Sequence, residues 1–185
     1  MKATEILMSE HQVIERMIAV LEKASDLLES GLEVPVQVFL DASDFIKGFA
    51  DGCHHKKEEG VLFKTMEQHG FSAHVGPIAV MLDEHEQGRS YNQAMRSAAQ
   101  KYASGDHTAA QDVIAAARGY ADLLTAHIAK ENQVLFPMAD KMIPAHKHDS
   151  VVEGFEHIEH EETGEGIHEK YLALVDRLEE EVSKL

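Results

Sequence analysis

Six residues in this sequence have the types and spacings of a metal site in a helical protein. Four are histidines and two are glutamates, and each glutamate follows a histidine by four residues: His11, His54, Glu58, His85, His127 and Glu131. Four residues advance an α-helix by slightly more than one turn, so each histidine–glutamate pair shares one helix face. Imidazole nitrogens and carboxylate oxygens together suit iron, manganese or zinc. The set therefore predicts metal ligation as the chemistry of this chain.

Both glutamates fall on helix faces that are otherwise apolar. An uncompensated carboxylate in a protein core costs several kcal/mol, a large share of the roughly 10 kcal/mol that stabilises a typical domain. No lysine or arginine occupies the same faces, so the compensating positive charge is expected to be a metal ion. The alternative is a set of core histidines with incidental glutamates on the helix flanks.

Glycine and proline divide the chain into four segments that are long enough for extended helices, followed by a tail. The segments cover about 3–30, 35–69, 77–104 and 107–139, with Gly31, Gly70 and Gly105 just past three of their ends. Short connections make neighbouring helices antiparallel. We expect an all-α fold, with an up-down-up-down four-helix bundle over residues 1–140. Residues 141–185 are expected to form a C-terminal helical extension that packs on the bundle.

The spacing of the histidines indicates that they lie at one level of such a bundle. Each lies 20 to 22 residues from the turn that joins the first helix to the second or the third to the fourth. The two halves also repeat, because His54 and His127 are 73 residues apart, as are the two glutamates, and His11 and His85 are 74 apart. This pattern predicts a helical hairpin used twice around one site with near two-fold symmetry.

The apolar faces can be followed along the helices that carry the histidine–glutamate pairs. In the second segment the face is an i+4 line: Ile46, Ala50, His54, Glu58 and Leu62. In the fourth it alternates between spacings of four and three: Tyr120, Leu124, His127, Glu131, Val134 and Met138. Gly48, Gly52 and Gly88 either loosen their helices or leave space for a small molecule. Tyr91 and Tyr120 are expected in the core rather than at the metals.

The chain resembles the hemerythrin-like proteins, which carry an HHE cation-binding domain. The resemblance covers about residues 3–140 and rests on four motifs: Glu10-His11, HHKKEEGVLF from His54, Asp83-Glu84-His85-Glu86, and HIAKENQVLFP from His127. The two Val-Leu-Phe tags follow Glu58 and Glu131 at equal distances, which favours His54 over His55 as the ligand. The resemblance implies a four-helix bundle that holds two non-haem iron ions, bridged by the glutamates and by an oxo or hydroxo group. Manganese or zinc are the alternative ions.

Hemerythrin-like proteins bind oxygen, sense oxygen or iron, react with peroxide or nitric oxide, or serve iron-centre repair. The resemblance therefore implies a small diatomic ligand or peroxide as the partner of this centre. Oxygen-carrying members use five histidines, whereas four are in register here, so a more exposed and reactive centre is expected. Two alternatives stay open: a peroxide-consuming or oxidase enzyme at the same centre, and an iron- or zinc-responsive interaction module without redox turnover.

Several residues near the predicted ligands are interpreted as neighbours rather than ligands. They are Glu15, Cys53, His55 and Glu59. In the tail, the pairs His157/Glu161 and Glu156/His160 are interpreted as parts of a solvated helix. A ferritin-like site needs two Glu-x-x-His helices, and the isolated Glu165-x-x-His168 sequence does not supply them.

The overall charge bears on partners and location. Against 17 lysines and arginines stand 33 acidic residues, a net charge of −16, which disfavours nucleic-acid binding. The N-terminal residues lack the features of a signal peptide, and no stretch is apolar enough to span a membrane. A cytoplasmic location is therefore expected, while protein partners and oligomeric state stay open.

Overall fold

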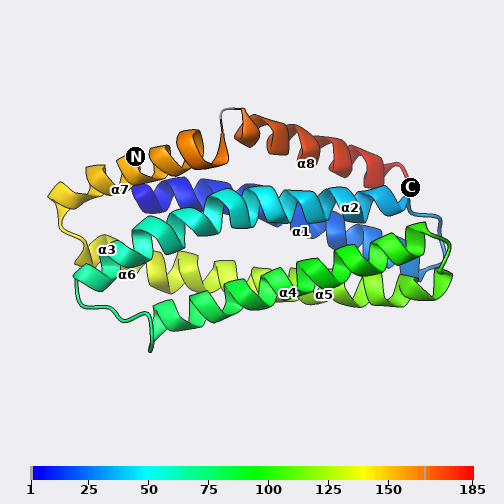
Figure 1. Cartoon of the computed structure of the whole chain (residues 1–185), viewed down its shortest axis with the longest axis horizontal. Coiled ribbons are helices and arrows are strands. Elements are labelled where there is room, and N and C mark those ends of the chain that lie inside the picture. Colours follow the sequence, from blue (N-terminus) through cyan, green and yellow to red (C-terminus); the bar gives the residue numbers. More distant parts are fainter. Residues whose placement is uncertain (1, 165) are drawn as a thin grey trace.

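Four long antiparallel helices form the body of the molecule in the computed structural model, which describes residues 2–164 and 166–185 (Figure 1). The first helix is α1 (Ala3–Glu29) and the third is α4 (Pro77–Ala103). The second helix consists of α2 (Val36–Phe45), η1 (Ile46–His55), η2 (Glu58–Leu62) and α3 (Phe63–Gln68). The fourth helix consists of η3 (His107–Ala109), α5 (Ala110–Lys130), η4 (Glu131–Leu135) and α6 (Phe136–Met142).

The predicted helix segments agree with the observed helices to within about three residues at each end. The described residues contain no strand, so the all-α prediction is confirmed. Gly31 and Gly70 follow the first and second helices with φ values of +84° and +100°. Glycine adopts this left-handed backbone at little cost, which explains why the helices end there.

The buried apolar side chains form two clusters rather than one. Leu7 belongs to the cluster near the start of α1, and Ile14 belongs to the cluster further along the bundle. In the fourth helix, Leu135 and Ile128 are divided between the clusters in the same way. His11 lies between Leu7 and Ile14 in the sequence and is itself buried. A layer of buried polar side chains therefore separates the two apolar regions.

Three short stretches of the second and fourth helices are π-helices, in which the backbone bonds run from residue i to i+5. They are η1, η2 and η4, and η2 and η4 each begin at one of the two predicted bridging glutamates. A π-turn inserts one extra residue into a helix and is frequently found at functional sites. The two halves of the bundle each contain such a π-turn, and the two turns begin 73 residues apart at equivalent positions.

The π-turn after Glu131 corrects two predicted core positions, Val134 and Met138, the second of which is only partly buried. The spacing pattern placed Val134 in the core, yet its side chain is 50% exposed, whereas Leu135 is 1% exposed. The extra residue of η4 shifts the buried face by one position beyond Glu131. In the second helix, the predicted core residues follow each other at a constant spacing of four. All of these residues are buried, including Leu62 at the end of the series.

The C-terminal residues form helices that lie along one side of the bundle (Figure 1). They are η5 (Ala145–Lys147), α7 (His148–His157), η6 (Ile158–Thr163) and α8 (Ile167–Ser183). These helices contact α1 and the second helix, with η6 against η1 and α8 against α1 and α2. A Cβ atom at Gly48 would overlap the Tyr171 hydroxyl, so this glycine lets α8 pack closely. None of the described helices has the length and apolar character needed to cross a membrane.

Candidate metal centre

The structure brings all six predicted metal-site residues into the polar layer between the two apolar clusters, and adds a seventh, His55. The donor atoms form two groups, in each of which every atom lies within 4.8 Å of the others. One group contains His11, His54, Glu58 and Glu131, and the other contains His55, Glu58, His85 and His127. All seven side chains are at most 2% exposed. The predicted common level of the four histidines is therefore observed.

The two glutamates lie between the groups, with one oxygen of each turned toward either side. Glu131 Oε2 is 3.1 Å from His11 Nε2, and its Oε1 is 3.3 Å from His127 Nε2. Glu58 Oε1 is 3.6 Å from His54 Nε2, and Glu58 Oε2 is 3.4 Å from His85 Nε2. Both carboxylates are thus placed to bridge two cations.

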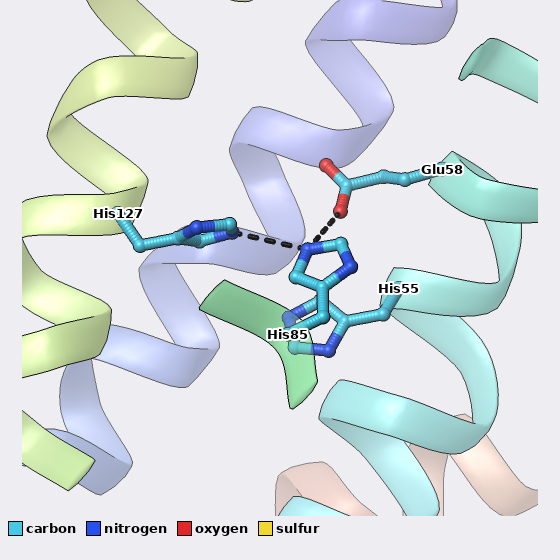
Figure 2. A group of neighbouring side chains, drawn as sticks. All are labelled: His55, Glu58, His85 and His127. Carbon is cyan, nitrogen blue, oxygen red and sulfur yellow. Dashed lines mark hydrogen bonds and ion pairs between the residues drawn. The ribbon is translucent and has the colours of Figure 1, made fainter. Parts of the chain in front are cut away.

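The group that includes His55 is drawn in Figure 2, where its side chains converge from three helices. His85 Nε2 lies 3.2 Å from His127 Nε2 and 3.4 Å from Glu58 Oε2. The His55 ring stacks on the His85 ring, with ring centres 3.9 Å apart. The three imidazoles and one carboxylate therefore surround one small volume.

His55 corrects the expectation that four histidines are in register and that His54 alone of the adjacent pair faces the site. In a regular α-helix, neighbouring residues point about 100° apart, so only one of the two was expected to face inward. Both histidines lie in the π-helix η1, and both side chains are buried, one in each donor group. Because a π-helix has more residues per turn than an α-helix, it changes the angle between neighbouring side chains, and both histidines can face the polar layer here.

Every one of the five histidines is oriented by a hydrogen bond at its Nδ1 atom. The acceptors lie 2.7 to 2.9 Å away and are Asn132 for His11, Glu10 for His54, Asp51 for His55, Glu59 for His85 and Glu84 for His127. An Nδ1–H group that donates to such an oxygen leaves the Nε2 lone pair free for a metal. The five Nε2 lone pairs are therefore directed into the polar layer.

The inward atoms fit bound cations because nothing in the described protein satisfies them. The Nε2 atoms of His11, His54 and His55 and all four carboxylate oxygens of Glu58 and Glu131 are buried without a hydrogen-bond partner. The remaining two Nε2 atoms face each other at 3.2 Å, although both rings donate from Nδ1. Buried polar atoms are rarely left unpaired, and two facing lone pairs repel. Cations between these atoms would resolve all of these conflicts.

The residues that orient the histidines repeat with the same two-fold pattern as the ligands. Glu10 and Glu84 each come directly before a histidine of the site, and each accepts a hydrogen bond from a lysine: Lys57 for Glu10 and Lys130 for Glu84. The sequence analysis did not assign these residues. The repeated Glu-His dipeptides and the 73-residue spacing of the two lysines were the signals that could have identified them.

Phenylalanines of the two Val-Leu-Phe tags cover the histidines on the outer side. Phe136 stacks on His11, with ring centres 5.4 Å apart, and Phe63 stacks on His85 at 6.1 Å. Both phenylalanines are buried. The two phenylalanines belong to the apolar cluster that contains Leu7, so this cluster packs directly against the polar layer.

The other residues considered in the sequence analysis lie outside the two donor groups. Glu15 is exposed, and Cys53 is buried as a free thiol. Tyr120 is in the core, whereas Tyr91 is 38% exposed and covers Gly119, which corrects its expected core position. Glu59 is a partner of His85 rather than simple flanking surface. The tail residues Glu156, His157, His160 and Glu161 are exposed, and Glu165 lies outside the described residues.

Without metal, the two glutamates differ in their proton affinity. Burial and the charge of Glu131 raise the pKa of Glu58 well above its ordinary value. Burial also acts to raise the pKa of Glu131, but the nearby imidazoles of His11 and His127 outweigh it, so this pKa is lowered. The metal-free site therefore holds one proton-binding carboxyl beside one carboxylate that is held by imidazoles.

The histidines of the metal-free site also differ in their pKa values. Burial lowers the pKa of His54 to about 4 and lowers that of His55 well below its ordinary value, so both are neutral at pH 7. Burial opposes the charged form of His11 and His127 as well, but Glu131 outweighs it and raises both pKa values. One histidine of each donor group therefore holds a proton more tightly than usual.

Metal affinity is expected to fall as the pH is lowered from 8 to 5. A protonated imidazole cannot bind a metal, and the raised pKa values of His11 and His127 place a competing proton in each group. With one proton displaced per ion, affinity should fall about tenfold for each pH unit below these pKa values. Calorimetric titration with Zn²⁺ in two buffers of different ionisation enthalpy measures both the affinity and the protons released. An affinity that is constant across this range would contradict the assignment.

Comparison with known proteins places the chain in a family. The family model described as the hemerythrin HHE cation-binding domain matches residues 2–139. One uncharacterised protein of Mycobacterium bovis and two of Mycobacterium tuberculosis are each 26% identical to the chain over 163 residues, which is 88% of the chain. The chain spans 63% of the length of these relatives. No solved structure matches it significantly. With most of its length covered by the family model and its histidines and glutamates gathered in one layer, the chain belongs to the hemerythrin family of HHE cation-binding domains.

Proposed function

We propose that this protein holds two non-haem iron ions between its helices and binds a small ligand such as oxygen or nitric oxide at them. The observation that carries the proposal is the set of seven buried side chains whose inward donor atoms lack protein hydrogen bonds or face one another. His11, His54, Glu58 and Glu131 would hold one ion, and His55, His85 and His127 would hold the other together with the same two glutamates. Metal loading would satisfy these atoms.

The chemistry of the donors favours iron. Five imidazole nitrogens and two carboxylates form a mixed nitrogen and oxygen set, which suits iron and manganese, while zinc prefers four-coordinate sites. The thiol of Cys53 is in neither donor group. Manganese and zinc remain the ions against which iron should be compared.

The fifth histidine shifts the proposed function toward ligand binding. The four-histidine count indicated a more exposed centre than that of the oxygen-carrying hemerythrins, but His55 completes a set of five. With both glutamates bridging, the ion at His11 and His54 would have four protein donors and the other ion would have five, so the first ion would have more room for an added ligand. Bound iron would supply the electrons for reversible oxygen binding, while the surrounding residues orient the imidazoles at their Nδ1 atoms and keep the donor atoms buried.

Anaerobic titration with Fe²⁺, followed by optical spectroscopy, tests this proposal. We expect two ions per chain, and a reversible absorption change on separate addition of oxygen or nitric oxide. Peroxide that disappears over many cycles would instead support the peroxide-consuming enzyme. Stability changes on metal loading without any reaction would support the metal-responsive interaction module. Failure to bind two ions would overturn the proposal.

A further inference from the structure

A buried lysine joins the C-terminal extension to the candidate metal centre. The Lys57 side chain is 0% exposed, and its Nζ atom lies 2.5 Å from Glu10 Oε1 and 2.8 Å from Glu159 Oε2. Glu10 belongs to α1, whereas Glu159 belongs to η6 of the extension. A buried ammonium is tolerated when it is paired, and here one of its two partners comes from outside the four-helix bundle.

The same glutamate that pairs with Lys57 also orients a candidate ligand. Glu10 Oε2 accepts a hydrogen bond from His54 Nδ1 at 2.8 Å, while Oε1 of the same carboxylate contacts Lys57. Polar contacts therefore run without a gap from Glu159 through Lys57 and Glu10 to His54. They connect the extension to the donor group of His11 and His54.

The other half of the bundle has the same lysine and glutamate but no third member. Lys130 contacts Glu84, which accepts a hydrogen bond from His127 Nδ1. Lys130 is 42% exposed, and Glu84 is its only described partner. The two halves therefore differ in that the extension covers one lysine and leaves its counterpart at the surface.

The positive charge of Lys57 also explains a third group of candidate ligand atoms. Donor atoms of Glu10, Glu159 and His168 lie within 4.8 Å of one another, which is the geometry of a cation site. The Lys57 ammonium is already in hydrogen-bonding contact with both carboxylates. This group is therefore a lysine-filled ion pair network and not a third metal site.

Glu159 is placed to affect how strongly Glu10 accepts the His54 hydrogen bond, because both carboxylates contact Lys57. With Glu159 present, the charge of Lys57 is shared between two carboxylates. Without it, Lys57 would neutralise Glu10 more completely, and the hydrogen bond from His54 would weaken. A carboxylate that accepts the second N–H of a ligating histidine fixes the ring and raises its basicity, and losing such a partner costs about 10- to 100-fold in metal affinity.

We propose that Glu159 is a positioning residue through which the C-terminal extension tightens the metal ion held by His11 and His54. This inference rests on the proposed two-ion centre. The extension then increases the affinity of the protein for only one of the two ions, because the Lys130–Glu84–His127 set has no equivalent of Glu159.

The Glu159→Gln variant tests the inference, with Glu156→Gln as its matched control. Glu156 is exposed and lies three residues earlier in the same extension. Titration with Co²⁺, read by its visible absorption, should show one of the two ions bound about 5- to 10-fold more weakly in Glu159→Gln, since Glu159 acts on Glu10 through Lys57 and so lies two residues further from the metal. The second ion and the Glu156→Gln variant should match the wild type. Glu159→Asp should recover part of the lost affinity.

Imidazole N–H resonances of the Zn²⁺-loaded protein supply a readout that a purely structural role would not move. We expect the His54 Nδ1–H signal to shift upfield in Glu159→Gln, while the His127 Nδ1–H signal stays unchanged as an internal reference. Equal weakening of both ions, or behaviour identical to Glu156→Gln, would overturn the inference while leaving the two-ion centre intact. A wild-type protein that binds no Co²⁺ would overturn the proposed function itself.

Discussion

Replacing Glu58 by glutamine is expected to weaken binding of both metal ions by more than about 100-fold, the largest effect of any single substitution in this chain. The reason is that Glu58 presents one oxygen to each donor group, 3.6 Å from His54 and 3.4 Å from His85. An amide offers one neutral oxygen in place of two charged ones, so both ions lose one of the two carboxylates that compensate their charge. Titration with Fe²⁺ under anaerobic conditions measures the loss.

The same substitution should make the metal-free protein more stable, by about 1–3 kcal/mol at pH 7. The pKa of Glu58 is raised by burial and by Glu131, so its folded form favours the proton. A group of this kind stabilises the fold below its unfolded pKa, and this contribution is lost as pH rises through the folded pKa. Glutamine is neutral in both the folded and the unfolded protein, so it avoids this loss of stability.

The exposed Glu15 supplies the matched control for this experiment. Glu15→Gln removes one carboxylate from the surface of α1, one turn beyond His11, and should change neither metal affinity nor stability measurably. Chemical denaturation with and without metal follows both proteins. A Glu58→Gln variant that still binds two ions tightly, or that is less stable without metal, would show that Glu58 does not carry the buried charge assigned to it.

Replacing His55 by isoleucine is expected to reduce binding from two ions to one at metal concentrations that saturate the wild type. Isoleucine occupies the equivalent position in the other half of the bundle, Ile128, where it is buried, so the side chain is compatible with this layer. The ion held with His85 and His127 would lose one of three imidazoles, and its affinity should fall by about 10- to 100-fold. The ion at His11 and His54 should remain.

Metal analysis of the variant after dialysis gives the stoichiometry, and His74→Ile is the control because His74 is exposed. If His55→Ile retains both ions and the wild-type spectrum, His55 is a packing residue against His85 and the ligand set contains four histidines. If it loses both ions, the two donor groups do not act as separate sites.

The sequence predicts the helices and the common level of the histidines because both follow from local rules. Glycine and proline mark the turns, and the equal distances from each turn place His11, His54, His85 and His127 in one layer. These features depend on helix rise and chain length alone. The family assignment also follows from them, because the two repeated motifs are local.

The π-turns explain where prediction from sequence failed. A regular helix of 3.6 residues per turn cannot place adjacent His54 and His55 in two donor groups of one site, or bury Leu135 while exposing Val134. The π-turns in η1 and η4 do both, and they form because packing and the buried polar layer outweigh local helix preferences. No residue pattern in this sequence identifies such turns in advance.

The contacts between the C-terminal extension and the bundle could not be predicted from the sequence either. Lys57 falls on a helix face next to the ligands, and a lysine is expected at the surface. It is buried because Glu159, 102 residues later, lies over it and supplies a second negative charge. Tertiary packing of this kind is set by both helices together, so neither segment shows it alone.

The most direct test of the central claim is a crystal structure of the iron-loaded protein with anomalous scattering recorded at the iron edge. The two-ion centre predicts two anomalous peaks in the buried layer. One should be coordinated by His11 and His54, the other by His55, His85 and His127, and both should contact Glu58 and Glu131. A single peak, or peaks only at surface histidines, would contradict the claim that these seven side chains exist to hold a pair of metal ions.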